Sequence, residues 1–343
     1  MAAGVTSEVA ETLPPLPDLS ADLATLVAQI PRGCVTSYGD LAEALGDLSA
    51  AKWVAVELQR EDLTRTGVPV HRVIRRTREL PGKLPDDRER RQRLLRSEGC
   101  HFESDARIAA VHLWREFVTT RPLRRLADWQ REVAGRVPSP RQVSVPDVVA
   151  GVDLSYSSST SAVAAYVAIE VPTGRVVTQH VCRAATPFPY ISGYLTFREL
   201  PPLLQLLSEV RQQGPSAEVV LVDGSGILHP RRFGIAVSVG LLAGCTTIGI
   251  SKHRLCGQVR EEPLLPVGHA VWHEDEWRGI ATDGGFDRST LYVSPGCGID
   301  VVSAANIVQA VWTDPRGPAP IALADRISRQ TARADQTAKG FSP

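Results

Sequence analysis

The sequence predicts an α/β domain preceded by a small, mainly helical domain. The chain has 343 residues and is 43% hydrophobic, enough for two domains at roughly 100–200 residues each. From about residue 146, apolar β-branched runs separated by turn residues are followed by alternating helical and strand-like segments. Before that point, helical spacing and arginine-rich stretches dominate.

Charge is distributed unevenly along the chain. The totals balance, with 38 Lys and Arg against 38 Asp and Glu, but residues 1–51 carry one basic and seven acidic side chains, whereas residues 52–98 carry thirteen basic and eight acidic ones. Such a basic segment suits contact with nucleic acid, although solvated helix faces also explain it. Only four basic residues are lysines, so Lys252, inside an apolar stretch, is a candidate for specific chemistry.

The six cysteines are widely spaced and form no CxxC pair, which argues against a zinc ribbon or a disulfide framework. No apolar run approaches the roughly 18 residues of a membrane helix. The acidic, proline-rich start lacks the basic and apolar blocks of a signal peptide. We expect a cytoplasmic protein with no membrane partner and no organic cofactor.

Caps, spacing and breakers predict the N-terminal elements. Two short helices joined by a turn at Gly46, the second capped by Ser49, have the pattern of a helix-turn-helix, a weak signal because many helical hairpins share it. The expected elements are a disordered lead-in at 1–20, helices at 21–30, 37–46 and 50–60, an extended wing-like segment at 67–80, a charged helix at 86–98 and a linker helix holding Trp114 and Trp129.

The C-terminal elements begin with three β-rich runs that predict a meander. The later runs are continuously apolar, as in strands that are buried on both faces. In order, the expected elements are strands at 148–156, 162–171 and 174–184, a helix at 195–213, a strand within 217–226, a helix at 234–244 and a strand at 245–252.

Three carboxylates stand at positions that suggest chemistry. Asp153 and Asp223 each end an apolar run, and Glu199 lies in the helix after the meander. Buried acids are costly unless a cation pairs with them, and oxygen ligands from separate strands suit Mg²⁺ or Mn²⁺. Such a cluster supports metal-assisted phosphodiester hydrolysis. From spacing alone, an equally good interpretation is that Asp153 and Asp223 are caps that start turns.

The loop after Asp223 favours the chemical interpretation. The stretch DGSGILHPRRFG (223–234) places glycines, His229 and two arginines directly after a buried strand, as a phosphate-contacting loop would. Lys252 ends the next strand, where it can neutralise a phosphate. Taken singly, His229 is more often a satisfied loop histidine, but in this company we place it among the DNA-contacting residues.

Residues 121–335 resemble endonuclease V, a deoxyinosine-directed nuclease family with an RNase H-like fold. The matching stretches are VAGVDLSY, PYISGYLTFREL, LVDGSGILHPRRFGIA, TIGISKHRLCG and LYVSPG, in the family's order. The resemblance implies a mixed sheet with flanking helices. It also implies that Asp153, Glu199 and Asp223 hold Mg²⁺ or Mn²⁺ as a cofactor, and that Lys252 contacts a phosphate.

The same resemblance assigns the parts that recognise the lesion. A wedge that enters the duplex corresponds to Pro189, Tyr190 and Ile191. The glycine-rich loop at Gly224 and Gly226 corresponds to the pocket for the altered base.

Three positions depart from the family's pattern. Ser192 replaces the second proline of the wedge, which makes its tip less rigid. Cys297 and Ser238 stand where the family commonly has histidines, which leaves the metal preference and the rate open. The carboxylates are retained.

Residues 21–106 resemble the DNA-binding domain of O6-alkylguanine-DNA alkyltransferases, through IPRGCVTSYGDLAEALG and VPVHRVI. In those enzymes the second motif carries the acceptor cysteine, and Val70 occupies that position here. Because a valine cannot accept an alkyl group, the domain resembles the alkyltransferase-like proteins, which bind alkylated guanine and recruit other repair proteins. Those proteins usually carry Trp at this position, so Val70 is atypical.

This second resemblance also assigns residue roles. Tyr38 would push on the phosphate beside the flipped nucleotide, and Lys52 stands where an arginine normally fills the vacated stack. Lysine is a poorer stacking plug than arginine, which leaves the affinity for the lesion open. Arg72 belongs to the motif and is counted among the DNA-binding residues, with a structural role for His71 and Arg72 as the alternative.

We therefore predict a DNA-repair protein that nicks DNA at the second phosphodiester 3′ of deoxyinosine or another altered base, with an N-terminal module that binds alkylated guanine without alkyl transfer. Its alternatives are a non-catalytic lesion-binding protein with a degenerate nuclease domain and a nuclease that prefers inosine-containing RNA. The expected segments are a lead-in (1–20), the alkyltransferase-like domain (21–106), a linker (107–120), the nuclease domain (121–335) and a tail (336–343).

Overall fold

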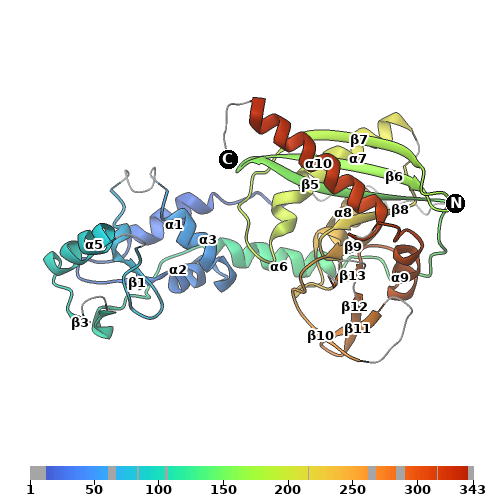
Figure 1. Cartoon of the computed structure of the whole chain (residues 1–343). Coiled ribbons are helices and arrows are strands. Elements are labelled where there is room, and N and C mark those ends of the chain that lie inside the picture. The colour runs from blue at the N-terminus through green and yellow to red at the C-terminus, as the bar shows by residue number, and fades with distance from the viewer. Residues whose placement is uncertain are drawn as a thin grey trace. The chain divides into compact units, whose positions relative to one another are not determined.

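The computed structural model describes residues 13–60, 67–82, 85–104, 107–214, 216–261, 268–282, 290–314 and 316–338 (Figure 1). The chain divides into two compact units. The N-terminal unit holds Pro14–Trp129 and Tyr190–Ser192, and the C-terminal unit holds Leu13, Gln130–Pro189 and the chain from Gly193 onward. Most of the expected lead-in, and the tail after residue 338, lie outside the described residues.

The N-terminal unit is mainly helical, as predicted. Its helices are α1 (Leu19–Ala28), α2 (Tyr38–Leu45), α3 (Ala51–Glu57), α5 (Pro85–Ser97) and α6 (Pro122–Ala134), the last of which runs on into the C-terminal unit. Its shorter elements are β1 (Thr36–Ser37), β2 (Val73–Ile74), β3 (Phe102–Ser104), β4 (Arg107–Ile108) and the 3-10 turns η1 (Leu48–Ala50), η2 (Val70–Arg72) and η3 (Ala110–His112). Apolar side chains from these segments form a small core of their own.

Helix α2 begins and ends where the sequence predicts. Ser37 and Asp40 form a capping box, in which Ser37 Oγ accepts from the Asp40 N–H at 3.0 Å and Asp40 Oδ2 accepts from the Ser37 N–H at 3.1 Å. Gly46 ends the helix with φ +109°, and a Cβ there would lie 2.5 Å from the Arg124 nitrogen. Only glycine fits this turn, so the turn predicted at Gly46 is confirmed.

Two expectations for this unit are wrong. Ser49 does not cap the second helix, because Asp47 Oδ1 accepts from the Ser49 N–H at 2.8 Å and caps η1, and α3 follows η1 without a side-chain cap. Trp114 lies outside α6, because its N–H donates to the Val35 carbonyl at 2.7 Å and so extends the backbone pairing beside β1.

Two further segments differ from their expected form. The segment expected to be an extended wing is mostly turn and η2, and only the two residues of β2 pair with β1, in parallel. The segment 107–114, expected to be linker, contains β4 and η3, and β4 pairs with β3 inside the N-terminal unit.

One nine-stranded mixed sheet forms the C-terminal unit, in the order β10-β11-β12-β13-β9-β8-β5-β6-β7. Its strands are β5 (Val148–Ser158), β6 (Ser161–Glu170), β7 (Val176–Ala185), β8 (Val219–Asp223), β9 (Thr246–Ser251), β10 (Gln258–Val259), β11 (Gly268–His273), β12 (Glu276–Thr282) and β13 (Tyr292–Pro295). The strands β5, β6 and β7 form the predicted antiparallel meander, and β5, β8 and β9 are parallel. The predicted strands are therefore confirmed.

Helices cover both faces of this sheet (Figure 1). The predicted helices α7 (Leu195–Gln213) and α8 (Ile235–Ala243) pack on one face, and α9 (Val301–Ala310) and α10 (Ala319–Ala338) pack on the other. Side chains alternate along the strands, so that Val220 packs toward α7 and α8 while Leu221 packs toward α9 and α10. None of the described helices combines the length and apolar character needed to cross a membrane.

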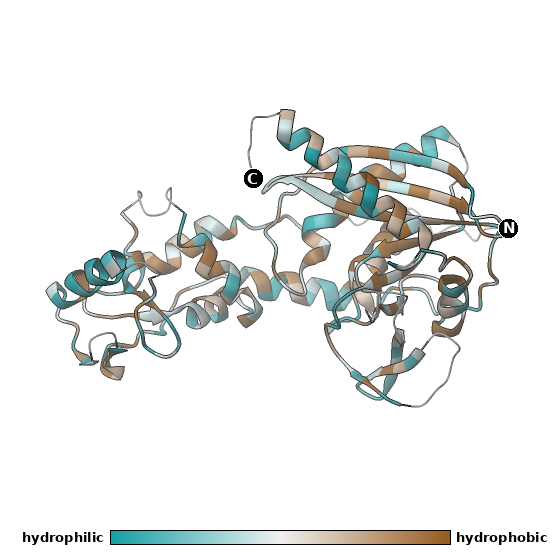
Figure 2. Ribbon diagram, viewed as in Figure 1, coloured by the Kyte–Doolittle hydropathy of each residue, from teal (hydrophilic) through white to brown (hydrophobic). Residues whose placement is uncertain are grey.

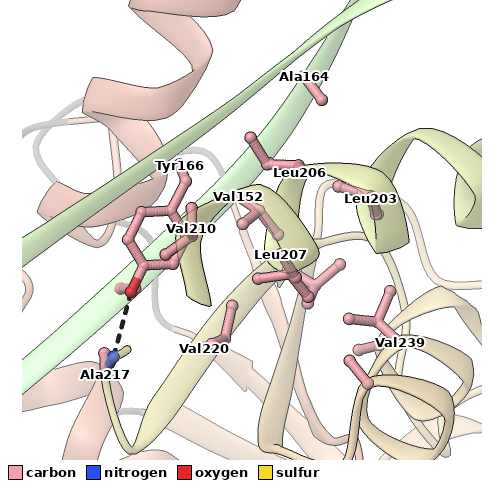
Figure 3. Close-up of a cluster of buried hydrophobic side chains, with 14 of the residues drawn as sticks. Val152, Ala164, Tyr166, Leu203, Leu206, Leu207, Val210, Ala217, Val220 and Val239 are labelled. Atoms are coloured by element: carbon pink, nitrogen blue, oxygen red, sulfur yellow. Dashed lines mark hydrogen bonds between the residues drawn. The ribbon is translucent and has the colours of Figure 1, made fainter. Parts of the chain in front are cut away.

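The core under α7 and α8 is closely packed (Figure 3). Tyr166 extends its ring among the leucines and valines of this layer, and its hydroxyl oxygen accepts a hydrogen bond from the Ala217 N–H at 3.2 Å. The central strands are coloured largely as hydrophobic in Figure 2, and their side chains enter the buried clusters on both faces of the sheet. This two-sided burial explains why β8 and β9 read as continuous apolar runs.

Helix α10 lies directly against β5, the strand that carries Asp153. The close approach requires a glycine, because a Cβ on Gly151 would overlap the carbonyl group of Pro320. The sequence analysis did not predict α10, which nevertheless adds residues to the site described below.

Replacing Gly151 with Ala is expected to lower the free energy of unfolding by roughly 1–3 kcal/mol, because the added methyl group must displace α10 from β5. Denaturant unfolding followed by circular dichroism measures the change. Gly135→Ala is the control, since the Cβ there would meet only the Glu132 carbonyl oxygen, at 3.3 Å. Equal stability of Gly151→Ala and the wild type would contradict the packing described for α10.

Candidate active site

Asp153 and Asp223 lie side by side on neighbouring parallel strands. Val152 pairs with Val222 between β5 and β8, so the two aspartates are the next residue of each strand. Asp153 is 4% exposed and Asp223 is half-buried. Asp153 also pairs with Ala165 inside β5, which continues to Ser158, so its interpretation as a turn-starting cap is wrong.

This pair is strongly unfavourable as two charges. Burial, followed by the charge of the Asp223 carboxylate, raises the pKa of Asp153 to about 9. The Ser328 hydroxyl acts in the opposite direction, because it donates to Asp153 Oδ2 at 2.6 Å. Two carboxylates this close are stable together only when a proton or a cation neutralises one of them.

Glu199, from α7, lies within electrostatic reach of the pair. Burial raises the pKa of Glu199 to about 7, and the charge of Asp223 adds to this effect. The Tyr156 hydroxyl donates to Glu199 Oε1 and opposes the shift. The structure therefore brings the three predicted carboxylates into one neighbourhood, with Glu199 held by Tyr156.

Helix α10 supplies residues that the sequence analysis missed. Asp325 raises the pKa of Asp153 through its charge and lines the same cleft as Asp223. Ser328 binds Asp153, and Arg329 pairs with Asp325 at 2.7 Å. The spacing of Asp325, Ser328 and Arg329 puts them on one face of a helix, and this pattern in the sequence was the available signal.

The donor set fits a hard divalent cation. Asp153 and Asp223 offer adjacent carboxylate oxygens from two strands, and their mutual repulsion is what a cation relieves. Among the described residues, no three His, Cys, Asp or Glu side chains form a complete ligand set. A site with two protein carboxylates leaves positions for water and substrate oxygens, which is the usual arrangement for Mg²⁺.

A cleft of about 580 Å³ opens beside Asp223. Lys252 and His253, which follow β9, form part of its wall, and Arg316 and Arg329 form another part. Lys252 is exposed at the position predicted for a phosphate contact. Carboxylate and cationic side chains therefore line the same cleft, a combination that suits a phosphodiester backbone.

The loop after Asp223 depends on glycines. A Cβ on Gly224 would overlap the Ile235 side chain, and one on Gly226 would overlap the Pro295 carbonyl oxygen. The loop packs closely against β13 and the start of α8 for this reason. Gly224 also has φ +137°, a conformation that favours glycine.

His229 is a buried loop residue in this structure. It is 2% exposed, its Nδ1 accepts from the Arg231 N–H at 3.1 Å, and its Nε2 therefore donates to the Gly193 carbonyl at 3.1 Å. Burial lowers the pKa of His229 to about 3, so the ring is neutral. Because both ring nitrogens are engaged, His229 organises the loop, as the alternative interpretation had it, and its contact with DNA stays a prediction.

Ser238 and Cys297, which replace family histidines, lie away from the cleft walls. Ser238 is fully buried in α8, and its hydroxyl donates to the Ile235 carbonyl at 2.9 Å. Cys297 is 7% exposed, and burial raises the pKa of its thiol to about 11. Both side chains serve packing in this structure.

The three wedge residues differ in exposure. Pro189 is half-buried, Tyr190 is 65% exposed and Ile191 is 2% exposed. The exposed aromatic ring is therefore the member of the set that is free to meet a base.

In the N-terminal unit, Glu98 gathers the residues of the predicted motif. Arg72 binds both Glu98 oxygens at 2.8 Å, and His71 Nε2 lies 2.8 Å from Glu98 Oε1. Although burial opposes the effect, hydrogen bonds from Arg72 and His71 lower the pKa of Glu98 to about 2. Arg72 therefore forms its contacts within the N-terminal unit, which agrees with the structural role named as the alternative to DNA binding.

Tyr38 and Lys52 lie on the two helices of the predicted helix-turn-helix. Tyr38 is the first residue of α2 and is half-buried, and burial raises the pKa of its hydroxyl against the opposing charges of Arg91 and Arg75. Lys52 is exposed near the start of α3. Both side chains belong to one helical pair, as the sequence predicts.

Comparisons with known proteins match this arrangement. Residues 131–326 match the family model Endonuclease V, and residues 18–100 match the model for the DNA-binding domain of 6-O-methylguanine DNA methyltransferase. A bifunctional methyltransferase/endonuclease of Picrophilus torridus is 29% identical over 87% of this chain and 91% of its own length. Endonuclease V of Alkalilimnicola ehrlichii is 36% identical over 64% of this chain and 95% of its own.

A solved structure is also similar. It is a Ciona intestinalis Endonuclease V in complex with DNA containing an inosine followed by a ribo-adenosine, with a TM-score of 0.56 and 26% identity. The similarity covers 63% of this chain and 99% of that one.

Replacing Asp153 with Asn is expected to stabilise the metal-free protein. The folded pKa of Asp153 lies above its ordinary value of 3.8, so its unfavourable contribution is absent below that pH and grows as the pH rises toward about 9. An Asn oxygen still accepts from Ser328. In a chelator at pH 8, the free energy of unfolding should rise by roughly 2–4 kcal/mol, and denaturant unfolding at pH 5 to 9 measures it.

Asp314→Asn is the control of opposite sign. A hydrogen bond from Arg316 lowers the pKa of Asp314, so this carboxylate stabilises the fold above its ordinary pKa and its loss should destabilise slightly at pH 8. A pH-independent difference between Asp153→Asn and the wild type would contradict the pKa assigned to Asp153.

Proposed function

Because the chain belongs to the endonuclease V family, we propose that it is a DNA-repair endonuclease that nicks DNA 3′ of deoxyinosine or another altered base. The observation that carries this proposal is the adjacent Asp153–Asp223 pair at the edge of the cleft that Lys252 lines. By family resemblance, the cut falls at the second phosphodiester 3′ of the lesion.

We assign the cofactor to the carboxylates. Asp153 and Asp223 would hold Mg²⁺, or Mn²⁺ in its place, with Glu199 as a further ligand once Tyr156 releases it. When bound, such a cation activates a water molecule and stabilises the leaving oxyanion. Lys252 would neutralise the scissile phosphate, and Asp325 would support the same site from α10.

We assign recognition of the lesion to the wedge and to the glycine-rich loop. Tyr190 would stack into the duplex, with Pro189 and Ile191 shaping its base. The loop at Gly224 and Gly226 would receive the altered base, as the family resemblance implies. An RNase H-like arrangement of the mixed sheet supports this assignment. Ser238 and Cys297 do not line the cleft beside Asp223, which supports an active nuclease over a degenerate one.

We propose that the N-terminal unit is a winged helix-turn-helix module that binds DNA at alkylated guanine. Val70 presents no nucleophile, so binding occurs without alkyl transfer. Tyr38 and Lys52 would contact the DNA, and recruitment of excision-repair proteins is the expected consequence. The six cysteines are free thiols, which suits a reducing compartment and supports a cytoplasmic location.

Nicking of an end-labelled duplex with a single deoxyinosine tests the nuclease. In Mg²⁺ or Mn²⁺ the wild type should cut one nucleotide beyond the lesion, and a chelator should abolish the cut. Asp223→Ala should lose at least about a hundredfold in rate, because it removes a cation ligand. Asp128→Ala, an exposed carboxylate on α6, is the control and should cut normally.

Two results would redirect this proposal. Binding of the duplex without cutting in either metal would support the non-catalytic alternative. Preferential cutting of an inosine-containing RNA of the same sequence would support the RNA alternative.

A duplex that carries both O6-methylguanine and deoxyinosine tests the cooperation of the units. At subsaturating enzyme it should be nicked roughly tenfold faster than a duplex with deoxyinosine alone, because binding at one lesion raises the effective concentration at the other. Tyr38→Ala should remove this gain and leave nicking of the simpler duplex within about twofold. Equal wild-type rates on both duplexes would contradict the cooperation.

A further inference from the structure

The chain before and after the wedge is held by two arginines. We call Pro189–Ser192 the wedge loop; the residues at its ends are Phe188 and Gly193. The carbonyl oxygen of Phe188 accepts a hydrogen bond from Arg198, and that of Gly193 accepts one from Arg231. Along the chain, these contacts come before and after the exposed Tyr190.

The Arg198 contact is deeply buried. Arg198 is 8% exposed, and its Nη1 donates to the Phe188 carbonyl at 2.6 Å. Its guanidinium also stacks 4.3 Å from the centre of the Tyr156 ring, the residue that binds Glu199. One side chain therefore connects the start of the wedge loop with the carboxylate neighbourhood.

The Arg231 contact is part of a convergent set. Besides Arg231, His229 Nε2 and Gln130 Nε2 approach the Gly193 carbonyl, at 3.1 and 3.4 Å. Arg231 Nε donates to Gln130 Oε1 at 2.7 Å, and the guanidinium lies 4.5 Å from the centre of the Tyr194 ring. Three side chains thus converge on one backbone oxygen.

Gly193 has the conformation that this convergence requires. Its φ is +81°, and a Cβ there would lie 2.9 Å from Arg231 Nη2. A side chain at 193 would therefore both strain the backbone and displace the guanidinium.

The contacts of the two arginines argue against phosphate binding as their role. A phosphate-binding arginine presents its guanidinium to solvent, whereas Arg198 is buried and Arg231 is directed to Gly193, Gln130 and Tyr194. Desolvating a guanidinium is costly, so such contacts are stable only when several partners share it. Here the partners include the backbone carbonyl oxygens at the two ends of the wedge loop.

We propose that Arg198 and Arg231 are positioning residues for lesion recognition, an inference that rests on the proposed function. They fix the two ends of the wedge loop so that Tyr190 can push between stacked bases without the loop yielding. Neither residue contacts the reacting atoms. Separating stacked bases costs a few kcal/mol. If the ends of the loop were not fixed, the loop would change conformation instead of separating the bases.

The test compares two substrates that differ only in whether the bases are already separated. One is a fully paired duplex with deoxyinosine, and the other places the same deoxyinosine in a short unpaired bubble. Arg231→Met should reduce the single-turnover rate on the duplex about ten- to hundredfold, because it removes charged hydrogen bonds to Gly193 and Gln130. On the bubble the loss should shrink to about threefold or less.

Two further variants sharpen the test. Arg231→Lys keeps the charge and one donor, and it should recover part of the duplex rate. Arg183→Met is the matched control, because Arg183 is an arginine of the same unit, pairs with Asp335 at 2.7 Å and lies outside both the wedge loop and the cleft walls. It should cut both substrates within about threefold of the wild type.

The outcomes separate this inference from the function beneath it. If the wild type cuts neither substrate, the proposed function fails. If the wild type cuts and Arg231→Met loses equally on duplex and bubble, Arg231 has only a structural role and the inference is overturned. Full activity of Arg231→Met on the duplex overturns it as well.

Discussion

The C-terminal unit holds two carboxylates that repel each other, Asp153 and Asp223, on adjacent strands. Parallel pairing of β5 and β8 puts the two carboxylates on adjacent strands, and apolar packing on both sheet faces holds that register. Slippage by one residue would turn every side chain of a strand to the opposite face, so the chain cannot separate the charges without losing its core. The fold therefore maintains a local arrangement that a cation stabilises.

Helix α10 connects the core with the site. Its contact with β5 depends on Gly151, and the same contact brings Ser328 to Asp153 and Asp325 into the cleft. A hydrogen bond between residues 175 positions apart in the chain thus depends on a backbone approach that only glycine permits. The contact between α10 and β5 therefore contributes both to stability and to the geometry of the site, so a substitution in this contact affects both.

The N-terminal unit shows the complementary case, a polar network without a reactive group. Glu98 binds His71 and Arg72 beside Val70, so the charged framework of the motif is present while the side chain at the acceptor position is aliphatic. Such a site can recognise DNA but cannot form a bond with it. In the arrangement we propose, the N-terminal unit recognises DNA and the C-terminal unit hydrolyses it with the help of a metal ion.

Local pattern in the sequence determined most of the secondary structure and the two aspartates. Alternation and apolar runs predicted β5 to β9, and Gly46 predicted the end of α2, because these signals depend on near neighbours. Contacts between distant segments were decided by tertiary structure alone: the burial of His229, the attachment of Trp114 beside β1, and the arrival of Asp325 and Ser328 at Asp153. No local periodicity encodes which helix packs on which strand, since that choice depends on the shapes of both surfaces.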